Sequence, residues 1–193
     1  VADLLASRWY EVVEHLCRNP LVSYRTAHEL RPVDGHVFIT SDVKRRSQIF
    51  VGDSLTINVL PGDTKTLTDQ FVPGLARSGL PRRLMENLTA TRSSGRVPKA
   101  LGSNWVEEQL CKELSRYGES SLNNIRDQAR AEKETLGLNK EFEQLNKMIG
   151  AILTTQLDNG MLKTPIAIAT AKRVPFDIHR IKLFESLCDY LNQ

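Results

Sequence analysis

An amphipathic helix is predicted at the start of the chain, because apolar residues recur there at intervals of three and four. They are Leu5, Trp9, Val12 and Leu16. The helix should end before Pro20, since the residue preceding a proline is disfavoured in a helix. A second short helix is expected over 23–30. Two short helices in this order resemble the first part of a winged helix-turn-helix, so we expect winged-helix character within 1–60. Two packed helices of any α+β domain would give the same pattern.

The spacing of apolar residues then changes to that of strands. Three runs rich in β-branched and aromatic residues follow, at 36–40, 48–51 and 54–60, and turn residues separate them. In the third run apolar and polar residues alternate, which gives the strand one apolar face. We interpret the three runs as a small antiparallel sheet.

The second half of the chain has the period of helices. It follows an irregular stretch over 61–102 that contains one short predicted helix, 81–88. Four further helices are predicted, over 103–117, 120–135, 142–152 and 176–191. We therefore predict an α+β fold in which N-terminal helices and a small antiparallel sheet precede an all-helical C-terminal half. Two domains are expected, 1–102 and 103–193, with 89–99 as the hinge.

Composition and charge are those of a soluble globular protein. The chain has 193 residues, of which 40% are hydrophobic and 25% charged, and its net charge is +3. These values argue against disorder. The three cysteines, Cys17, Cys111 and Cys188, are far apart and lack metal-ligand spacing, so we expect reduced thiols. No run of about 18 apolar residues occurs, so we expect no membrane-spanning helix and a cytoplasmic location.

The sequence contains no evident catalytic constellation. It has no phosphate-binding glycine loop, zinc-protease motif or nucleophile elbow, and its four histidines are isolated. Asp53, Asp63 and Lys65 lie near strand ends and could form a nuclease-like site, but turn chemistry explains both aspartates better. We therefore assign no catalytic residue, no metal site and no cofactor. An uncharacterised hydrolase or nuclease remains a third hypothesis for the function.

Basic residues are the most distinctive chemical feature of the chain. Three of them, Lys44, Arg45 and Arg46, lie in the predicted turn between the first two strands, and the stretch 77–99 carries six basic residues against Glu86. A basic turn can lie along phosphates, each contact adding a salt-dependent increment of affinity. An ordinary charged hairpin and loop would give the same pattern. The candidate nucleic-acid-binding residues are Lys44, Arg45, Arg46, Arg82, Arg83, Arg92, Arg96 and Lys99.

The first half of the chain resembles the core of AbiEi-type antitoxins. The resemblance begins at 22–30, Val-Ser-Tyr-Arg-Thr-Ala-His-Glu-Leu, and continues with a strand that ends in Thr40 and with the basic residues that follow it. It extends to 71–88, where Gly-Leu-Pro precedes Arg-Arg-Leu-Met-Glu-Asn-Leu.

The helical half is similar to the region that precedes the catalytic domain in bacterial Fic-family proteins with an AbiEi-like front half. The similar stretches are 122–130, 138–155 and 175–185, so the resemblance covers nearly the whole chain. It implies a non-catalytic regulatory or recognition region of a protein AMP-transferase. Its partners would be its own or an associated Fic catalytic domain and a protein target. Because the chain begins with Val1 rather than Met, we expect that it begins inside a longer reading frame or was processed.

The motifs of Fic catalysis do not occur in this chain. The resemblance implies a His base and a Gly-Asn-Gly-Arg anion cradle for AMP transfer, and neither is found. Some Fic proteins are restrained by a helix whose Glu pairs with the cradle arginine. Residues 115–120 meet most of that pattern, but Gly118 lies where a continuous helix is needed, so we interpret the match as coincidental. If it were functional, Glu119 would be the inhibitory residue.

An alternative hypothesis places the chain in a different functional class. It would be a stand-alone AbiEi-type antitoxin, a transcriptional regulator of a toxin-antitoxin system that binds double-stranded DNA. Residues 1–31 would supply the helix-turn-helix, and Lys44, Arg45 and Arg46 would lie at the wing.

Overall fold

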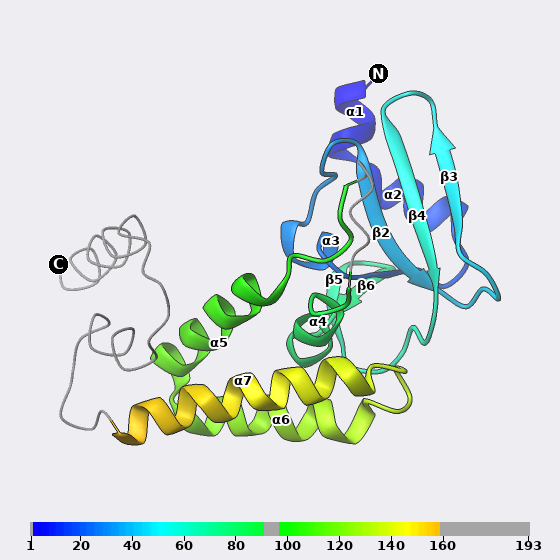
Figure 1. Ribbon diagram of the computed structural model, residues 1–193. Coiled ribbons are helices and arrows are strands. Elements are labelled where there is room, and N and C mark those ends of the chain that lie inside the picture. The colour runs from blue at the N-terminus through cyan, green and yellow to red at the C-terminus, as the bar shows by residue number, and fades with distance from the viewer. Residues whose placement is uncertain (1, 91–96, 159–193) are drawn as a thin grey trace, which may run out of the picture. The chain divides into compact units, whose positions relative to one another are not determined.

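The computed structural model describes residues 2–90 and 97–158 (Figure 1). It divides the chain into two compact units, 1–147 and 148–193, whereas the sequence pattern predicted a boundary at 102/103. The first unit has both helices and a sheet, which confirms the α+β class. The second unit is described only over 148–158, and the predicted helix 176–191 lies outside the described residues.

A six-stranded mixed sheet lies at the centre of the first unit. Its strand order is β3-β4-β2-β1-β6-β5. The strands are β1 (Leu21–Val22), β2 (His36–Ser41), β3 (Ser47–Val51), β4 (Leu55–Pro61), β5 (Thr68–Val72) and β6 (Leu75–Ser78). Strand β1 pairs in parallel with β6 and antiparallel with β2, so it joins the two halves of the sheet.

The predicted antiparallel sheet over 36–60 is wrong in its pairing. Strand β3 pairs antiparallel with β4, but β4 lies between β3 and β2 and pairs in parallel with β2. Side-chain alternation predicts which residues share a face, but it does not predict which strands are neighbours. The three runs were therefore identified correctly as strands and arranged incorrectly.

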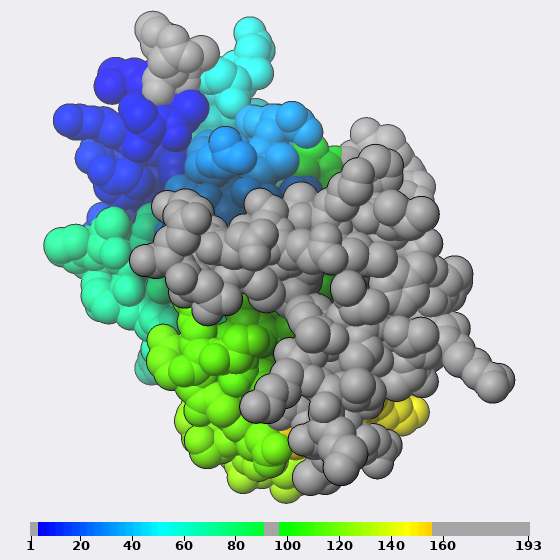
Figure 2. Space-filling model, turned by 90° about the vertical axis from the view of Figure 1, so that its left-hand side faces the viewer, coloured from blue at the N-terminus to red at the C-terminus, as the bar shows by residue number. Residues whose placement is uncertain are grey.

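The hydrophobic core lies on one face of the sheet, against the N-terminal helices α1 (Ala2–Ser7) and α2 (Trp9–Leu16). Helix α2 directs Trp9, Val13 and Cys17 into this core, where inward-facing apolar side chains of the strands meet them. The α2 helix also lies beside the β5–β6 hairpin, as the adjoining blue and teal surfaces show (Figure 2). There Trp9 stacks on Phe71 with ring centroids 5.9 Å apart.

The second predicted helix is a single turn, α3 (Thr26–Glu29), and strand β1 precedes it. The order in this segment is therefore helix, strand and helical turn, not two helices joined by a turn. Helix α3 is anchored to β2, because Thr26 Oγ1 accepts a hydrogen bond from the backbone N–H of Phe38 at 2.9 Å, and Ala27 of α3 belongs to the core. Next to α3, Thr40 Oγ1 of β2 donates to Ser23 Oγ at 2.9 Å.

Four helices follow the sheet. They are α4 (Leu80–Glu86), α5 (Ser103–Tyr117), α6 (Glu119–Glu132) and α7 (Asn139–Asp158). Helix α6 packs against both α4 and α5. These three helices belong to the same compact unit as the sheet. The predicted helices over 103–155 are thus present, and their apolar stripes are buried, as at Leu110, Leu122 and Leu145.

Candidate nucleic-acid interface

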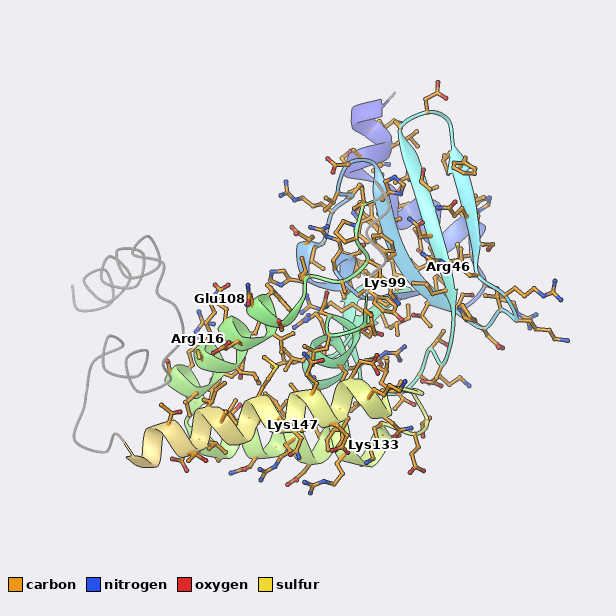
Figure 3. All side chains as sticks on the ribbon, in the orientation of Figure 1. Arg46, Lys99, Glu108, Arg116, Lys133 and Lys147 are labelled. Atoms are coloured by element: carbon orange, nitrogen blue, oxygen red, sulfur yellow. The ribbon has the colours of Figure 1, made fainter. Side chains whose placement is uncertain are left out.

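The basic turn lies between two strands that do not pair with each other. Residues 42–46 connect β2 to β3. Because β4 lies between these two strands in the sheet, the connection passes across the end of β4. Lys44, Arg45 and Arg46 are all exposed in it, as predicted for a surface that contacts phosphates. Figure 3 shows Arg46 at the end of the sheet where β3 begins.

A fourth basic residue, Lys99, lies near this turn (Figure 3). Its Nζ is 4.6 Å from the centroid of the Tyr24 ring, within the range of a cation–π contact. Burial lowers the pKa of Lys99, and the positive charge of Arg46 lowers it further, against the opposing carboxylates of Glu141 and Glu86. Because the charges of Arg46 and Lys99 interact, two separate loops contribute to one basic region.

The segment that carries Lys99 is fixed from both sides. The backbone N–H of Arg25 donates to the carbonyl of Lys99 at 2.9 Å. Two residues further on, the backbone N–H of Leu101 donates to Asn87 Oδ1 at 2.9 Å, and Asn87 itself is buried on the turn after α4. These bonds reduce the conformational entropy that Lys99 would lose on binding a ligand.

Tyr24 owes its position to a buried carboxylate. It has a φ of 54°, a left-handed conformation that is uncommon for a bulky residue. Its backbone N–H donates to Glu86 Oε2 at 2.8 Å, which holds it in this conformation. Burial, followed by the negative charge of Glu86, raises the pKa of Tyr24, so its hydroxyl stays protonated.

Arg82 belongs to the interior and not to the exposed basic surface on which it was expected. Its Nε donates to Glu86 Oε1 at 2.7 Å, and the two side chains are 3% and 2% exposed. Its terminal nitrogens donate to the carbonyls of Asp63 and Thr66, while Ser78 Oγ donates to Glu86 Oε2 at 2.7 Å. These hydrogen bonds compensate for the desolvation of the buried charges. The guanidinium of Arg82 therefore has a structural role in the interior.

The remaining basic candidates fall into two groups. Arg83 is half-buried, and its Nη1 donates to the carbonyl of Ala27 at 3.2 Å. Burial and the nearby charge of Arg77 lower the pKa of Arg83, so this residue also faces the protein. Arg92 and Arg96 lie outside the described residues. The described basic surface therefore consists of Lys44, Arg45, Arg46 and Lys99.

The other candidate sites have structural explanations. Asp63 Oδ2 accepts hydrogen bonds from the backbone N–H groups of Lys65 and Thr66. Burial alone would raise the pKa of Asp63, but these bonds and the charge of Arg82 lower it, as expected for a turn aspartate. Within residues 2–90 and 97–158, no three His, Cys, Asp or Glu side chains are grouped to bind a metal ion.

Glu119 begins a new helix instead of lying within one. Gly118, with a φ of 74°, separates α5 from α6, so Ser115 and Glu119 of the inhibitory pattern lie on different helices. Glu119 is exposed. The helix break agrees with the interpretation that this match is coincidental.

An exposed aromatic residue lies on the strand that follows the basic turn, and its exposure was not predicted from the sequence. Phe50, on the edge strand β3, is 71% exposed, although its strand is otherwise half-buried or polar. A strand pattern marks Phe50 as apolar but does not reveal that its face of the sheet is uncovered. Its exposure follows from the edge position of β3, which only the pairing order shows.

Comparisons of the chain with protein-family models, with curated proteins and with solved structures find no match. None of the helices in the described ranges combines the length and hydrophobicity that crossing a membrane requires.

Proposed function

We propose that this chain is a non-catalytic recognition region of a Fic-family protein AMP-transferase, acting with its own or an associated Fic catalytic domain. The proposal rests on the polar residues of the two motifs, 22–30 and 71–88, in which the chain resembles AbiEi-like regions. Both motifs include polar residues that are buried and hydrogen-bonded, Ser23 and Thr26 in the first motif and Arg82, Glu86 and Asn87 in the second. Chance similarity between surface segments would not select these positions.

The architecture supports a recognition role rather than a chemical one. The second motif fixes Tyr24 through Glu86 and the segment around Lys99 through Asn87. Both of these residues then lie beside the exposed basic turn. The resembling motifs thus form a rigid scaffold, and the exposed side chains on it are free to differ between proteins.

The test is to isolate the native protein with an antibody against this chain and to determine its mass and peptide map. We expect peptides with His-Pro-Phe and Gly-Asn-Gly-Arg, either in the same polypeptide or in a protein that co-isolates with it. Deleting this region should then change which proteins receive AMP from labelled ATP. A native product of 21.8 kDa with no such partner would overturn the proposal.

A second function, a regulator that binds double-stranded DNA, is favoured by the exposed turn with Lys44, Arg45 and Arg46. Binding of a fluorescent duplex should weaken as salt increases, and replacing all three residues by Ala should reduce the slope of log K against log salt by about 3. The matched control replaces three exposed cations elsewhere, Lys112, Arg116 and Lys147. Absence of duplex binding at low salt would remove this candidate.

A further inference from the structure

The face of the sheet opposite the α2 core presents aligned rows of side chains, which are exposed on the edge strand β3. Register places His36, Thr56 and Phe50 in one row across β2, β4 and β3. The next row consists of Phe38, Asn58 and Gln48. Because side chains of a strand alternate between faces, the residues of both rows point away from the core that contains Val37, Ile57 and Ile49.

Phe50 contributes little to the stability of the described fold. With 71% of its surface exposed, it does not bury the apolar area that normally justifies a Phe in a strand. A lone exposed apolar residue needs no explanation, but this one lies in a row with His36, on the strand that follows the basic turn. Its ring is therefore available to a planar ligand.

A buried amide orients the polar groups of the neighbouring row. Asn58 is 3% exposed, and its Oδ1 accepts a hydrogen bond from Gln48 Nε2 at 2.8 Å. Its Nδ2 donates to the carbonyl of Val37 and lies 3.2 Å from His36 Nδ1. An accepting Nδ1 places the proton of a neutral imidazole on Nε2. Gln48, two residues before Phe50 on β3, then offers an acceptor in Oε1, and His36, beyond Thr56 in the row of Phe50, offers a donor in Nε2.

The same face continues into the basic region. Arg46 directly precedes β3, and about 13 Å of extended chain separates it from Phe50. The charge of Arg46 also interacts with Lys99 and Tyr24, which come from two other loops. Glu141 contributes a negative charge next to Lys99, so the cationic end of this face is restricted to a small area.

We propose that this face binds single-stranded nucleic acid. An unpaired base would stack on Phe50, its edge would bond to Gln48 and His36, and adjacent phosphates would contact Arg46 and Lys99. The combination of aromatic, amide and cationic groups favours a polyanion that carries planar bases over an acidic peptide, which would not need the aromatic ring. A duplex keeps its bases stacked, so Phe50 distinguishes this ligand from the double-stranded DNA considered above. The inference does not depend on the Fic assignment.

The test measures fluorescence anisotropy of a labelled 12-nucleotide oligo-dT, the matching RNA and a duplex of the same length with the full chain. The variant F50A should bind the single strands about 5- to 150-fold more weakly, which corresponds to the loss of one base–aromatic stack. F50L should lose a similar amount, because it keeps apolar volume but has no aromatic face. The control Y117A removes an aromatic side chain that is 64% exposed on α5 and should bind as the unmodified chain does.

Each outcome separates this proposal from the others. Weaker binding by both Phe50 variants, with Y117A unchanged, supports it. Equal affinity of F50A and the unmodified chain for single strands, or no binding of single strands at low salt, overturns it. Duplex binding that depends on Lys44, Arg45 and Arg46 but not on Phe50 would leave the double-stranded DNA candidate intact and remove this one. If thymidine monophosphate displaces the oligonucleotide at equal nucleotide concentration, the site binds a mononucleotide and the strand proposal fails.

Discussion

Arg82 and Glu86 form an ion pair inside the protein, one helical turn apart on α4, with 2.7 Å between Nε and Oε1. The pair is the centre of a network that reaches strand β6 through Ser78 and the loop after β1 through Tyr24. Because both side chains are almost fully desolvated, removal of one partner leaves the other as an uncompensated buried charge. The network therefore contributes to stability and also positions the residues of the candidate interface.

Glu86→Ala should lower the free energy of unfolding by about 3–5 kcal/mol, because it removes the buried carboxylate that pairs with Arg82 and accepts hydrogen bonds from Tyr24 and Ser78. Urea denaturation followed by circular dichroism measures this. The matched control is Arg130→Ala, which breaks an exposed pair with Asp127 on α6 and should cost less than about 1 kcal/mol. Equal effects of the two substitutions would contradict the structural role of the buried pair.

Thr26→Val should lower the free energy of unfolding by about 1–3 kcal/mol, because the backbone N–H of Phe38 loses its acceptor inside the protein. Valine matches threonine in shape, so the loss reports the hydrogen bond rather than packing. Thr135→Val, at an exposed position, should change stability by less than about 0.5 kcal/mol. If Thr26→Val were as stable as the unmodified chain, α3 would not be anchored to the sheet in this way.

Gly35→Ala should destabilise the protein more than Gly52→Ala. Both glycines have left-handed backbones, with φ of 74° and 57°, so both substitutions carry the same kind of conformational cost, about 1–2 kcal/mol. A Cβ on Gly35 would lie 2.8 Å from the carbonyl oxygen of Ser54, whereas at Gly52 nothing lies within 4 Å. Thermal unfolding of the two variants measures the difference, and equal melting temperatures would argue against the close approach of 35 to 54.

Stability should depend on the protonation of His28. Burial, together with the positive charges of Arg83 and Lys112, lowers its pKa in the folded state, against the opposing carboxylates of Glu29 and Glu108. The ring also packs on Trp105, with centroids 4.8 Å apart. The unfolded chain therefore takes up the proton first as pH falls, and stability is lost below the unfolded pKa of about 6.5.

The variant His28→Gln isolates this effect. The free energy of unfolding of both proteins is measured from pH 8 to pH 5. As pH falls, that of the unmodified chain should decrease relative to that of the variant. Because the side chain is partly exposed, we expect a modest change. A difference that stays constant over this range would show that His28 titrates alike in the folded and unfolded states.

The sequence predicted local structure well where one period extends over several residues. The helix around Trp9 and Val13 and the strands around Ile39 and Ile57 were expected and are present. Strand β1, with only two residues, is too short to show a period. Its identity as a strand comes from pairing with segments far away in the chain, which local patterns do not encode.

The candidate interface was predictable only in part, because residue type does not determine burial. Arg46 and Arg82 both belong to basic stretches of the sequence. Arg46 is exposed, whereas Arg82 is buried beside Glu86, with 3% of its side chain exposed. The spacing of Arg82 and Glu86, four residues apart in a predicted helix, is compatible with a surface pair or a buried one. Only the burial of both side chains, with Ser78 of β6 bonded to Glu86, distinguishes the two.

The parallel pairing of Leu21 with Ala76 also affects how the protein is made. During synthesis β1 emerges well before β6, the strand that pairs with its other edge. Until then β1 and β2 expose an unpaired edge, which is a common starting point for association between nascent chains. A ribosome that pauses before residue 78 would prolong this exposure, so chaperone binding should be strongest for nascent chains that end between β2 and β6.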